Sequence, residues 1–297
     1  MPVMQENLGL LESDVFFRSG AGYFDLTRYG LVEVSGPDAS DFLQRMSTVD
    51  IRKLEIGAVS HGAWLTGRGQ AVALGYLIRR TSQDFHVLLS PGQNQRCVDH
   101  LEQFHFGENL SVGDRSQDFR CFGVVGAPVS PMHWFDTYFQ EDVRPWLGFH
   151  LVPTNEAPGF IAALSAPLLS PLLFDYLRIQ AGVPEFGREI SGSEIFLETG
   201  FDRAISRNKG CYPGQEVIER IFTYGSVNRL LKRVEWEGEV PRVPLPLFSG
   251  GKEAGTLVSW AEGPRGSKNV GLAYLAKAFW SGPLELSSGT LTATVLA

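Results

Sequence analysis

The sequence predicts an α+β fold that ends in a small β-barrel or sandwich. Runs with strand character, such as residues 31–34, 71–78 and 85–89, alternate with segments whose apolar residues recur at helical spacing. Beyond about residue 233 the chain changes character, because short β-like runs there alternate with Gly and Pro. Short strands separated by such turns are typical of a small barrel or sandwich.

Sequence signals for the start of a helix lie between these predicted strands. Gly36-Pro37-Asp38 predicts a helix whose Phe42, Leu43 and Met46 share one face. The clearest helix begins at Ser170, a favourable N-cap, with Pro171 in its first turn. We expect Gly182 to end it.

Composition limits the class of protein. The chain has 297 residues, 43% of them hydrophobic, and a net charge of −7, so two or three packed domains are expected and a general nucleic-acid-binding surface is not. Its three cysteines contain no Cys-x-x-Cys pair, which argues against a disulfide framework or a self-contained metal cluster. Residues 1–11 lack the pattern of a secretory signal, and no apolar run is long enough to span a membrane. We therefore expect a cytoplasmic protein without DNA or membrane partners.

The most unusual segment is Lys209-Gly-Cys-Tyr-Pro-Gly-Gln-Glu216. Pro213-Gly214 suits a tight turn, and an apolar pattern predicts a helix directly after it. A thiol just before a helix N-terminus and close to Lys209 would favour the thiolate, which makes Cys211 a candidate reactive residue and Lys209 its helper. The alternative is that Cys211 is a small apolar residue packed beneath the turn.

This segment resembles the signature of the YgfZ family, relatives of the glycine cleavage T protein that take part in iron–sulfur cluster maintenance and tRNA modification. Residues 25–30, 65–69, 177–184 and 255–259 also resemble the family pattern. The resemblance implies a T-protein-like arrangement of two α+β modules and a C-terminal β-barrel around a central channel. It implies a first module formed by residues 1–50 and 119–230, an inserted second module at 51–118, and a barrel at 231–297.

The resemblance also implies a bound cofactor, tetrahydrofolate or another reduced folate. The segment 177–184 resembles the one that contacts folate in relatives. The cofactor-binding residues that we expect lie in this segment, in the cysteine motif and in the following helix: Arg178, Gln180, Tyr212, Gln215, Glu216 and Arg220.

Two departures from the family pattern bear on this expectation. Gln180 stands where the family usually has Glu, and an amide cannot supply a carboxylate to a pterin. The strand at 70–78 carries no acidic residue, whereas the T protein is expected to have one there for its one-carbon chemistry. Folate binding should therefore be weakened, and aminomethyl transfer is disfavoured.

We accordingly expect a folate-binding accessory protein in iron–sulfur cluster assembly or repair and linked tRNA modification, without classical turnover. Its partners would be iron–sulfur client or assembly proteins, with an indirect link to tRNA. Residues 201–233 carry a net charge of +4, which could attract an anionic partner or simply be solvated. Two alternatives remain: a folate-dependent aminomethyltransferase, and a scaffold that no longer binds a ligand. None of the six histidines has metal-ligand spacing, so we predict structural or surface roles for them and no metal site.

Overall fold

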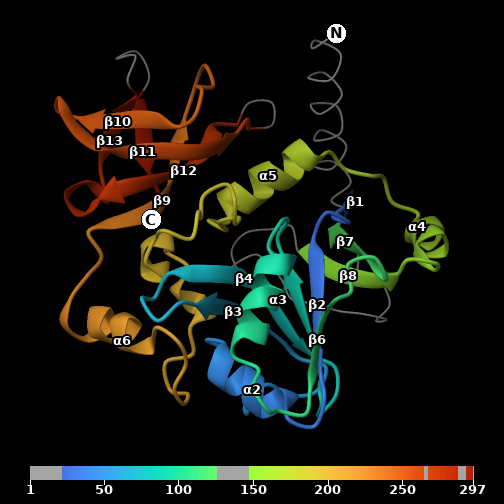
Figure 1. Cartoon of the computed structure of the whole chain (residues 1–297). Helices are drawn as coiled ribbons and strands as arrows, with labels where there is room; N and C mark the ends of the chain where they lie inside the picture. Colours follow the sequence, from blue (N-terminus) through green and yellow to red (C-terminus); the bar gives the residue numbers. More distant parts are fainter. Residues whose placement is uncertain (1–21, 126–146, 264–266, 287–291, 297) are drawn as a thin grey trace.

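The computed structural model in Figure 1 describes residues 22–125, 147–263, 267–286 and 292–296. The expectation about residues 1–11 lies outside this part of the chain. Within it, two sheets with flanking helices are followed by a closed barrel, which confirms the predicted α+β class and decides between barrel and sandwich.

The first sheet has three antiparallel strands in the order β1-β7-β8. It joins distant parts of the sequence, because β1 pairs with β7 and β7 with β8. Helix α5 begins as predicted, since the Ser170 side chain accepts a hydrogen bond from the Leu172 amide and Pro171 is the first residue. The elements of this part are β1 (Gly22–Asp25), β7 (Phe119–Val125), β8 (Leu147–Pro153), α4 (Ala157–Leu164) and α5 (Pro171–Gln180).

The second sheet has five strands in the order β3-β4-β5-β2-β6. Side chains alternate across it: Val32 and Leu77 pack beneath the helices α2 and α3, whereas Leu31 and Tyr76 face the core shared with the first sheet. The elements are β2 (Gly30–Ser35), α2 (Ala39–Met46), β3 (Val59–Leu65), β4 (Ala71–Arg79), β5 (Asp84–Leu89), α3 (Asn94–Gln103) and β6 (Ser111–Asp114).

This sheet begins earlier in the chain than expected. Strand β2 pairs with β5 and β6, so β2 and α2 belong with the strands assigned to 51–118 although they lie in the segment 1–50. The sequence of a short strand does not show which strand it pairs with. Only the pairing seen in the structure assigns β2 to the five-stranded sheet.

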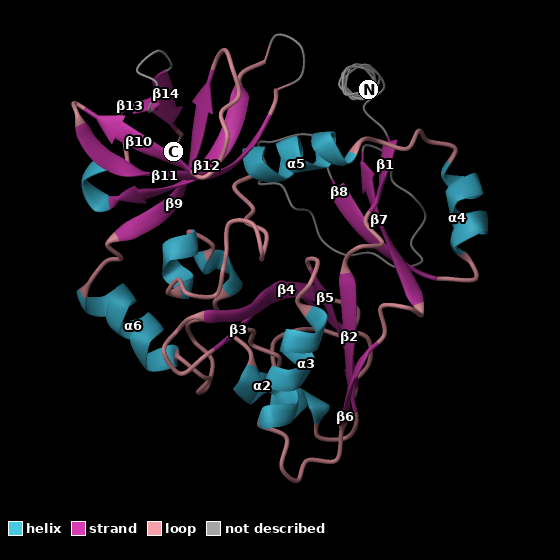
Figure 2. Ribbon diagram, turned by 45° about the horizontal axis from the view of Figure 1, so that its top comes forward, coloured by secondary structure: helices cyan, strands magenta, loops and turns pink. Residues whose placement is uncertain are grey.

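The C-terminal strands close into a six-stranded barrel in the order β10-β11-β12-β9-β14-β13. Helix α5 lies against β11 and β12, and Ile179 joins a cluster of barrel side chains. Figure 2 shows the barrel and the two sheets arranged around the loops and short helices that follow α5. The remaining elements are η1 (Phe196–Thr199), η2 (Asp202–Ala204), α6 (Gln215–Tyr224), β9 (Arg229–Trp236), β10 (Leu245–Ser249), β11 (Lys252–Ala261), β12 (Asn269–Ala276), η3 (Lys277–Phe279), β13 (Pro283–Leu286) and β14 (Thr292–Val295).

Candidate functional site

The cysteine motif forms a turn that ends at helix α6. Cys211 is exposed, whereas Cys97 and Cys121 are buried. Gly214 caps the helix with φ of +82°, a left-handed conformation that favours glycine. A Cβ at this position would lie 2.5 Å from the Thr66 carbonyl oxygen, so the glycine also allows close contact with the turn between β3 and β4. The predicted turn at Pro213-Gly214 and the helix after it are thus confirmed, and Cys211 lies just before that turn.

Lys209 makes contacts that the sequence did not predict. Its side chain is buried, and Nζ donates hydrogen bonds to the carbonyl oxygens of Gln44, at 2.6 Å, and of Ser47. Both carbonyls lie at the C-terminal end of α2, where a positive charge is favourable. Burial lowers the pKa of Lys209 to about 8. Its ammonium therefore fixes the motif to α2, and we assign it a positioning role in place of the predicted chemical one.

Further hydrogen bonds hold the chain before the motif against the segment that follows α2. The Thr48 hydroxyl donates to the Ala204 carbonyl, and the Ser206 amide donates to the Thr48 carbonyl at 2.9 Å. The Asp50 amide donates to the Ser206 hydroxyl at 3.2 Å. The turn that presents Cys211 is therefore anchored to the five-stranded-sheet unit over several residues.

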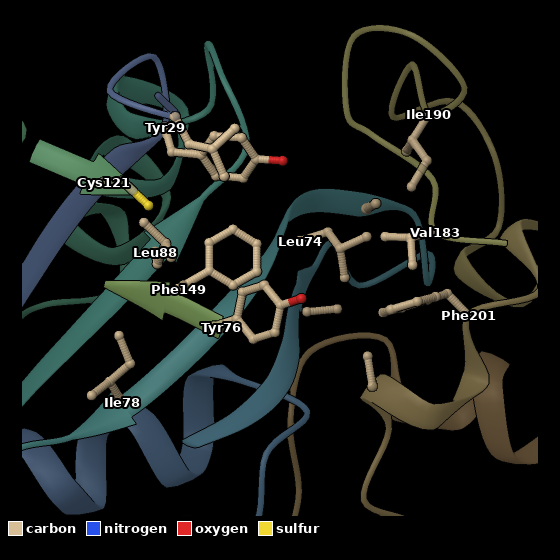
Figure 3. Close-up of a cluster of buried hydrophobic side chains, with 14 of the residues drawn as sticks. Tyr29, Leu74, Tyr76, Ile78, Leu88, Cys121, Phe149, Val183, Ile190 and Phe201 are labelled. Carbon is tan, nitrogen blue, oxygen red and sulfur yellow. The ribbon is translucent and has the colours of Figure 1, made fainter. Parts of the chain in front are cut away.

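A second feature is an aromatic pocket between this unit and the loop after α5. Figure 3 shows Tyr29 and Tyr76 on one side of it, opposite Val183 and Phe201. The His61 ring lies 4.5 Å from the Tyr76 ring and 5.2 Å from the Phe201 ring, centroid to centroid. The cavity volume is ≈ 20 Å³, which is space for about one water molecule. The lining residues are Tyr29, His61, Leu74, Gly75, Tyr76, Leu88, Ser90, Arg178, Val183, Pro184, Glu185 and Phe201.

Two charged residues of this lining differ in their bonding. Arg178, a predicted cofactor-binding residue, is buried and makes two 3.0 Å hydrogen bonds to the Glu189 carboxylate and one of 2.8 Å to the Val183 carbonyl. Most of its donors are thereby used within the fold. Glu185 is also buried, and sequence reasoning missed it, as it missed His61. The signal was a charged residue directly after the folate-like segment 177–184.

The other predicted cofactor-binding residues do not line the pocket. Gln180 lies at the end of α5, where its backbone carbonyl accepts a hydrogen bond from Arg233, and its buried Oε1 has no hydrogen-bond partner among the described residues. Tyr212 is packed in the core, and burial raises its pKa to about 12. Gln215 begins α6, and Glu216 and Arg220 are exposed on that helix. The structure thus brings Arg178 to the pocket and leaves these five outside its lining.

The expected basic surface is partly neutralised. Arg207 pairs with Glu219 and Arg229 with Glu198, both at 3.1 Å, and Lys209 is buried. The net charge of residues 201–233 therefore overstates the free positive charge that an anionic partner would meet.

Glu33, Asp84 and His86 place potential metal-ligand atoms within 4.8 Å of one another in the described part of the chain. Arg115 donates a hydrogen bond to Glu33 at 3.1 Å, and Nε of Arg80 lies 3.9 Å from the Asp84 carboxylate. Two cations thus already neutralise the two carboxylates. We interpret the group as an ion-pair network.

A family model, several known proteins and a solved structure are similar to this chain. The model of the GCVT N-terminal domain matches residues 12–132. An aminomethyltransferase from Symbiobacterium thermophilum is 26% identical over 93% of this chain and 83% of its own length. A chloroplastic protein of Arabidopsis thaliana, described as a candidate transferase, is 25% identical over 88% of this chain, which spans 66% of that protein. The crystal structure of the glycine cleavage system aminomethyltransferase T from Bartonella henselae superposes with a TM-score of 0.82 at 22% identity, covering 98% of this chain and 89% of that one.

These similarities show the fold. Residues 12–132 are similar to the GCVT N-terminal domain, and the chain has the fold of the glycine cleavage T protein with a C-terminal six-stranded barrel. Its relatives include aminomethyltransferases. In the part of the chain that the structure describes, no helix is both long and apolar enough to cross a membrane.

Proposed function

We propose that this protein is a YgfZ-type, folate-binding accessory protein that acts in the cytoplasm through the thiol of Cys211. Its role would lie in iron–sulfur cluster assembly or repair and in linked tRNA modification. The observation that carries the proposal is the setting of Cys211: it is the exposed cysteine of the three, on a turn anchored through Lys209 to α2. An accessible thiol on a rigid support suits transient contact with a cluster or with a client's ligands.

The aromatic pocket supports folate binding. Tyr and Phe rings offer stacking surfaces for a flat heterocycle, and buried polar groups offer hydrogen bonds. A pterin is larger than the one water molecule that fits here, so binding requires the rings or the loop at 183–190 to move apart. Because the open state is then a minor one, the apparent affinity for tetrahydrofolate should be modest.

The partners that fit this proposal are iron–sulfur client or assembly proteins, with tRNA linked only through those clients. With one exposed thiol in the described chain, a cluster would have to be shared with ligands from the partner. The partial neutralisation of residues 201–233 by ion pairs favours a protein partner over direct RNA binding.

Complementation tests this role. In a strain that lacks its own member of the family, Cys211→Ser should fail to restore iron–sulfur enzyme activity. The variant should still fold, because sulfur and oxygen are similar in size and the position is exposed, so a loss of less than ~1.5 kcal/mol in unfolding free energy is expected. Thr223→Ser, a small change at an exposed position of the adjacent helix, is the control. Normal complementation by Cys211→Ser would refute the proposed mechanism, and a collapsed melting temperature would favour a packing role.

A second candidate function is folate-dependent aminomethyl transfer. Two observations favour it: the names of the bacterial relatives, and the carboxylate of Glu185 in the pocket, which sequence reasoning had not placed there. Strand β4 still carries no acidic residue, and loss of a positioned acid–base group typically lowers a rate by ~100- to 10,000-fold. We therefore expect no measurable transfer from a lipoyl-bound aminomethyl donor to tetrahydrofolate. Transfer that Glu185→Gln abolishes would establish the second function instead.

A further inference from the structure

A second and larger cavity lies beside the chain that leads into the cysteine motif. Its volume is ≈ 380 Å³, within the ~300–1,000 Å³ typical of small-molecule sites, and it has no lining residue in common with the aromatic pocket. The residues that line it come from the segment after α2, the start of β3 and the chain before Lys209: Val49, Asp50, Lys53, Leu54, Val59, Ser60, Ser206, Arg207 and Asn208.

Hydrogen bonds fix the walls of this larger cavity. The Arg79 side chain donates to the carbonyls of Leu54, at 2.7 Å, and of Ile51, at 3.3 Å. The Asp50 amide donates to the Ser206 hydroxyl at 3.2 Å, which joins the wall after α2 to the wall before the motif. The cavity is therefore preformed, as small-molecule sites usually are.

The lining divides into an apolar inner part and a polar rim. Val49 and Leu54 are buried, at 2% and 9% exposed, whereas Lys53 and Arg207 have exposed side chains. Because buried side chains lie deeper than exposed ones, the apolar groups form the inner wall and the cations surround the opening. Such a lining fits a ligand with an apolar part and a charged end.

The rim has hydrogen-bond donors to spare. The Arg207 guanidinium donates to the Glu219 carboxylate at 3.1 Å and lies 4.4 Å from the Phe222 ring centroid, so its position is fixed. This is the one hydrogen bond that it makes to the described residues, although a guanidinium carries five N–H donors. Its other donors are therefore available to an anion.

The charges at the cavity favour a ligand with a single negative charge. Lys53 and Arg207 stand against Asp50 in the lining, which leaves one positive charge in excess. Lys53 lies 3.0 Å from the Asp50 carboxylate, and Glu219, outside the lining, offsets part of the charge of Arg207. A carboxylate therefore suits the site, whereas a dianion would meet repulsion from Asp50.

We propose that the larger cavity binds a small organic acid, with its carboxylate on Arg207 and its apolar part against Val49 and Leu54. A guanidinium can donate two parallel N–H bonds to one carboxylate, and Lys53 supplies a second cation at the rim. The site goes beyond the proposed function, because neither the aromatic pocket nor the Cys211 thiol takes part in it.

A chemical-shift titration of the full-length chain by NMR tests the inference, with benzoate as the probe and benzamide as its uncharged counterpart. Benzoate should shift the backbone amide signals of Asp50 and Asn208, and benzamide should bind at least about threefold more weakly. Phenyl phosphate, which carries a second negative charge, should bind no more tightly than benzoate.

Variants show whether the rim cations hold the carboxylate. Arg207→Gln should weaken benzoate binding about three- to tenfold. Arg229→Gln is the matched control and should bind like wild type, since Arg229 also pairs with a glutamate at 3.1 Å and lies over an aromatic ring, but outside the cavity. Lys53→Gln, at a side chain that is 73% exposed, should also weaken binding and leave the melting temperature unchanged.

Four results would overturn the inference. Equal affinity for benzoate and benzamide would show that charge is not recognised, and equal weakening by Arg207→Gln and Arg229→Gln would show that the cavity is not the site. Tighter binding of phenyl phosphate would exclude the carboxylate as the preferred anion. No shift of the cavity signals at ~10 mM benzoate would place the Kd well above ~1 mM and exclude a binding site.

Discussion

At the scale of single residues, the three cysteines differ in what surrounds them. Cys97 packs among the side chains beneath α3, and Cys121 lies in the core between the two sheets. Burial raises the pKa of Cys97 to about 12 and also raises that of Cys121. Cys211 is exposed on its turn. Since the thiolate is the reactive form, chemistry should concentrate at Cys211.

Iodoacetamide labelling of the native protein at pH 8, followed by peptide mapping, should therefore modify Cys211 first. For Cys97, a rise from 9.0 to about 12 lowers the thiolate fraction about a thousand-fold, and burial also blocks access. In denaturant the three cysteines should label at similar rates, which is the control. Faster native labelling of Cys97 or Cys121 would contradict the site assignment.

At the scale of elements, the start of α6 depends on one glycine. Gly214 has a left-handed backbone, and a Cβ there would approach the Thr66 carbonyl oxygen at 2.5 Å and the Gly69 Cα at 2.9 Å. The turn between β3 and β4 therefore packs directly on the helix cap. Sequence reasoning found the turn but could not show that a second turn lies against it.

Gly214→Ala should destabilise the protein by about 1–3 kcal/mol, through left-handed strain and the displacement of a neighbouring backbone. Gly57→Ala is a matched control, since Gly57 also has positive φ, +84°, but a Cβ there would meet nothing within 4 Å. Urea denaturation of both variants measures the difference. If Gly214→Ala lowers the unfolding free energy no more than Gly57→Ala does, the close contact at Gly214 does not contribute to stability.

At the scale of the whole molecule, the motif joins separate parts of the chain. Lys209 lies 165 and 162 residues from Gln44 and Ser47, whose carbonyls its ammonium holds. The aromatic pocket likewise combines strands of the five-stranded sheet with the loop after α5. The candidate site therefore exists only when these units are packed together.

Lys209→Met should lower the unfolding free energy by ~1–3 kcal/mol at pH 7, because it leaves two helix-end carbonyls without their donor. Burial lowers the folded-state pKa of Lys209 from 10.5 to about 8. Between these values the unfolded chain binds more protons than the folded one, so wild-type stability rises with pH. The stability difference between wild type and Lys209→Met should thus increase from pH 8 to pH 10 in urea titrations. A difference that shrinks over this range would show that the pKa of Lys209 is not lowered in the folded state.

How far the sequence predicted the site differs from residue to residue. The turn around Cys211 and the helix after it follow from local signals, Pro213-Gly214 and the apolar pattern, and both are present. The contacts of Lys209 with the end of α2 could not be predicted, because proximity in sequence does not fix the direction of a long side chain. Glu185 and His61 were missed as pocket residues, since neither carries a local pattern and each reaches the pocket through tertiary packing.

The sequence by itself determined the α+β class, the start of α5 at Ser170, the C-terminal barrel strands and the unusual turn at Cys211, because each depends on neighbours a few residues apart. Only the tertiary structure decided that β2 belongs to the five-stranded sheet, that Lys209 binds the end of α2, and that Glu185 lines an aromatic pocket. These features depend on strand pairing and on contacts between residues far apart in sequence. Such contacts are set by the packing of complete elements, which no local pattern records.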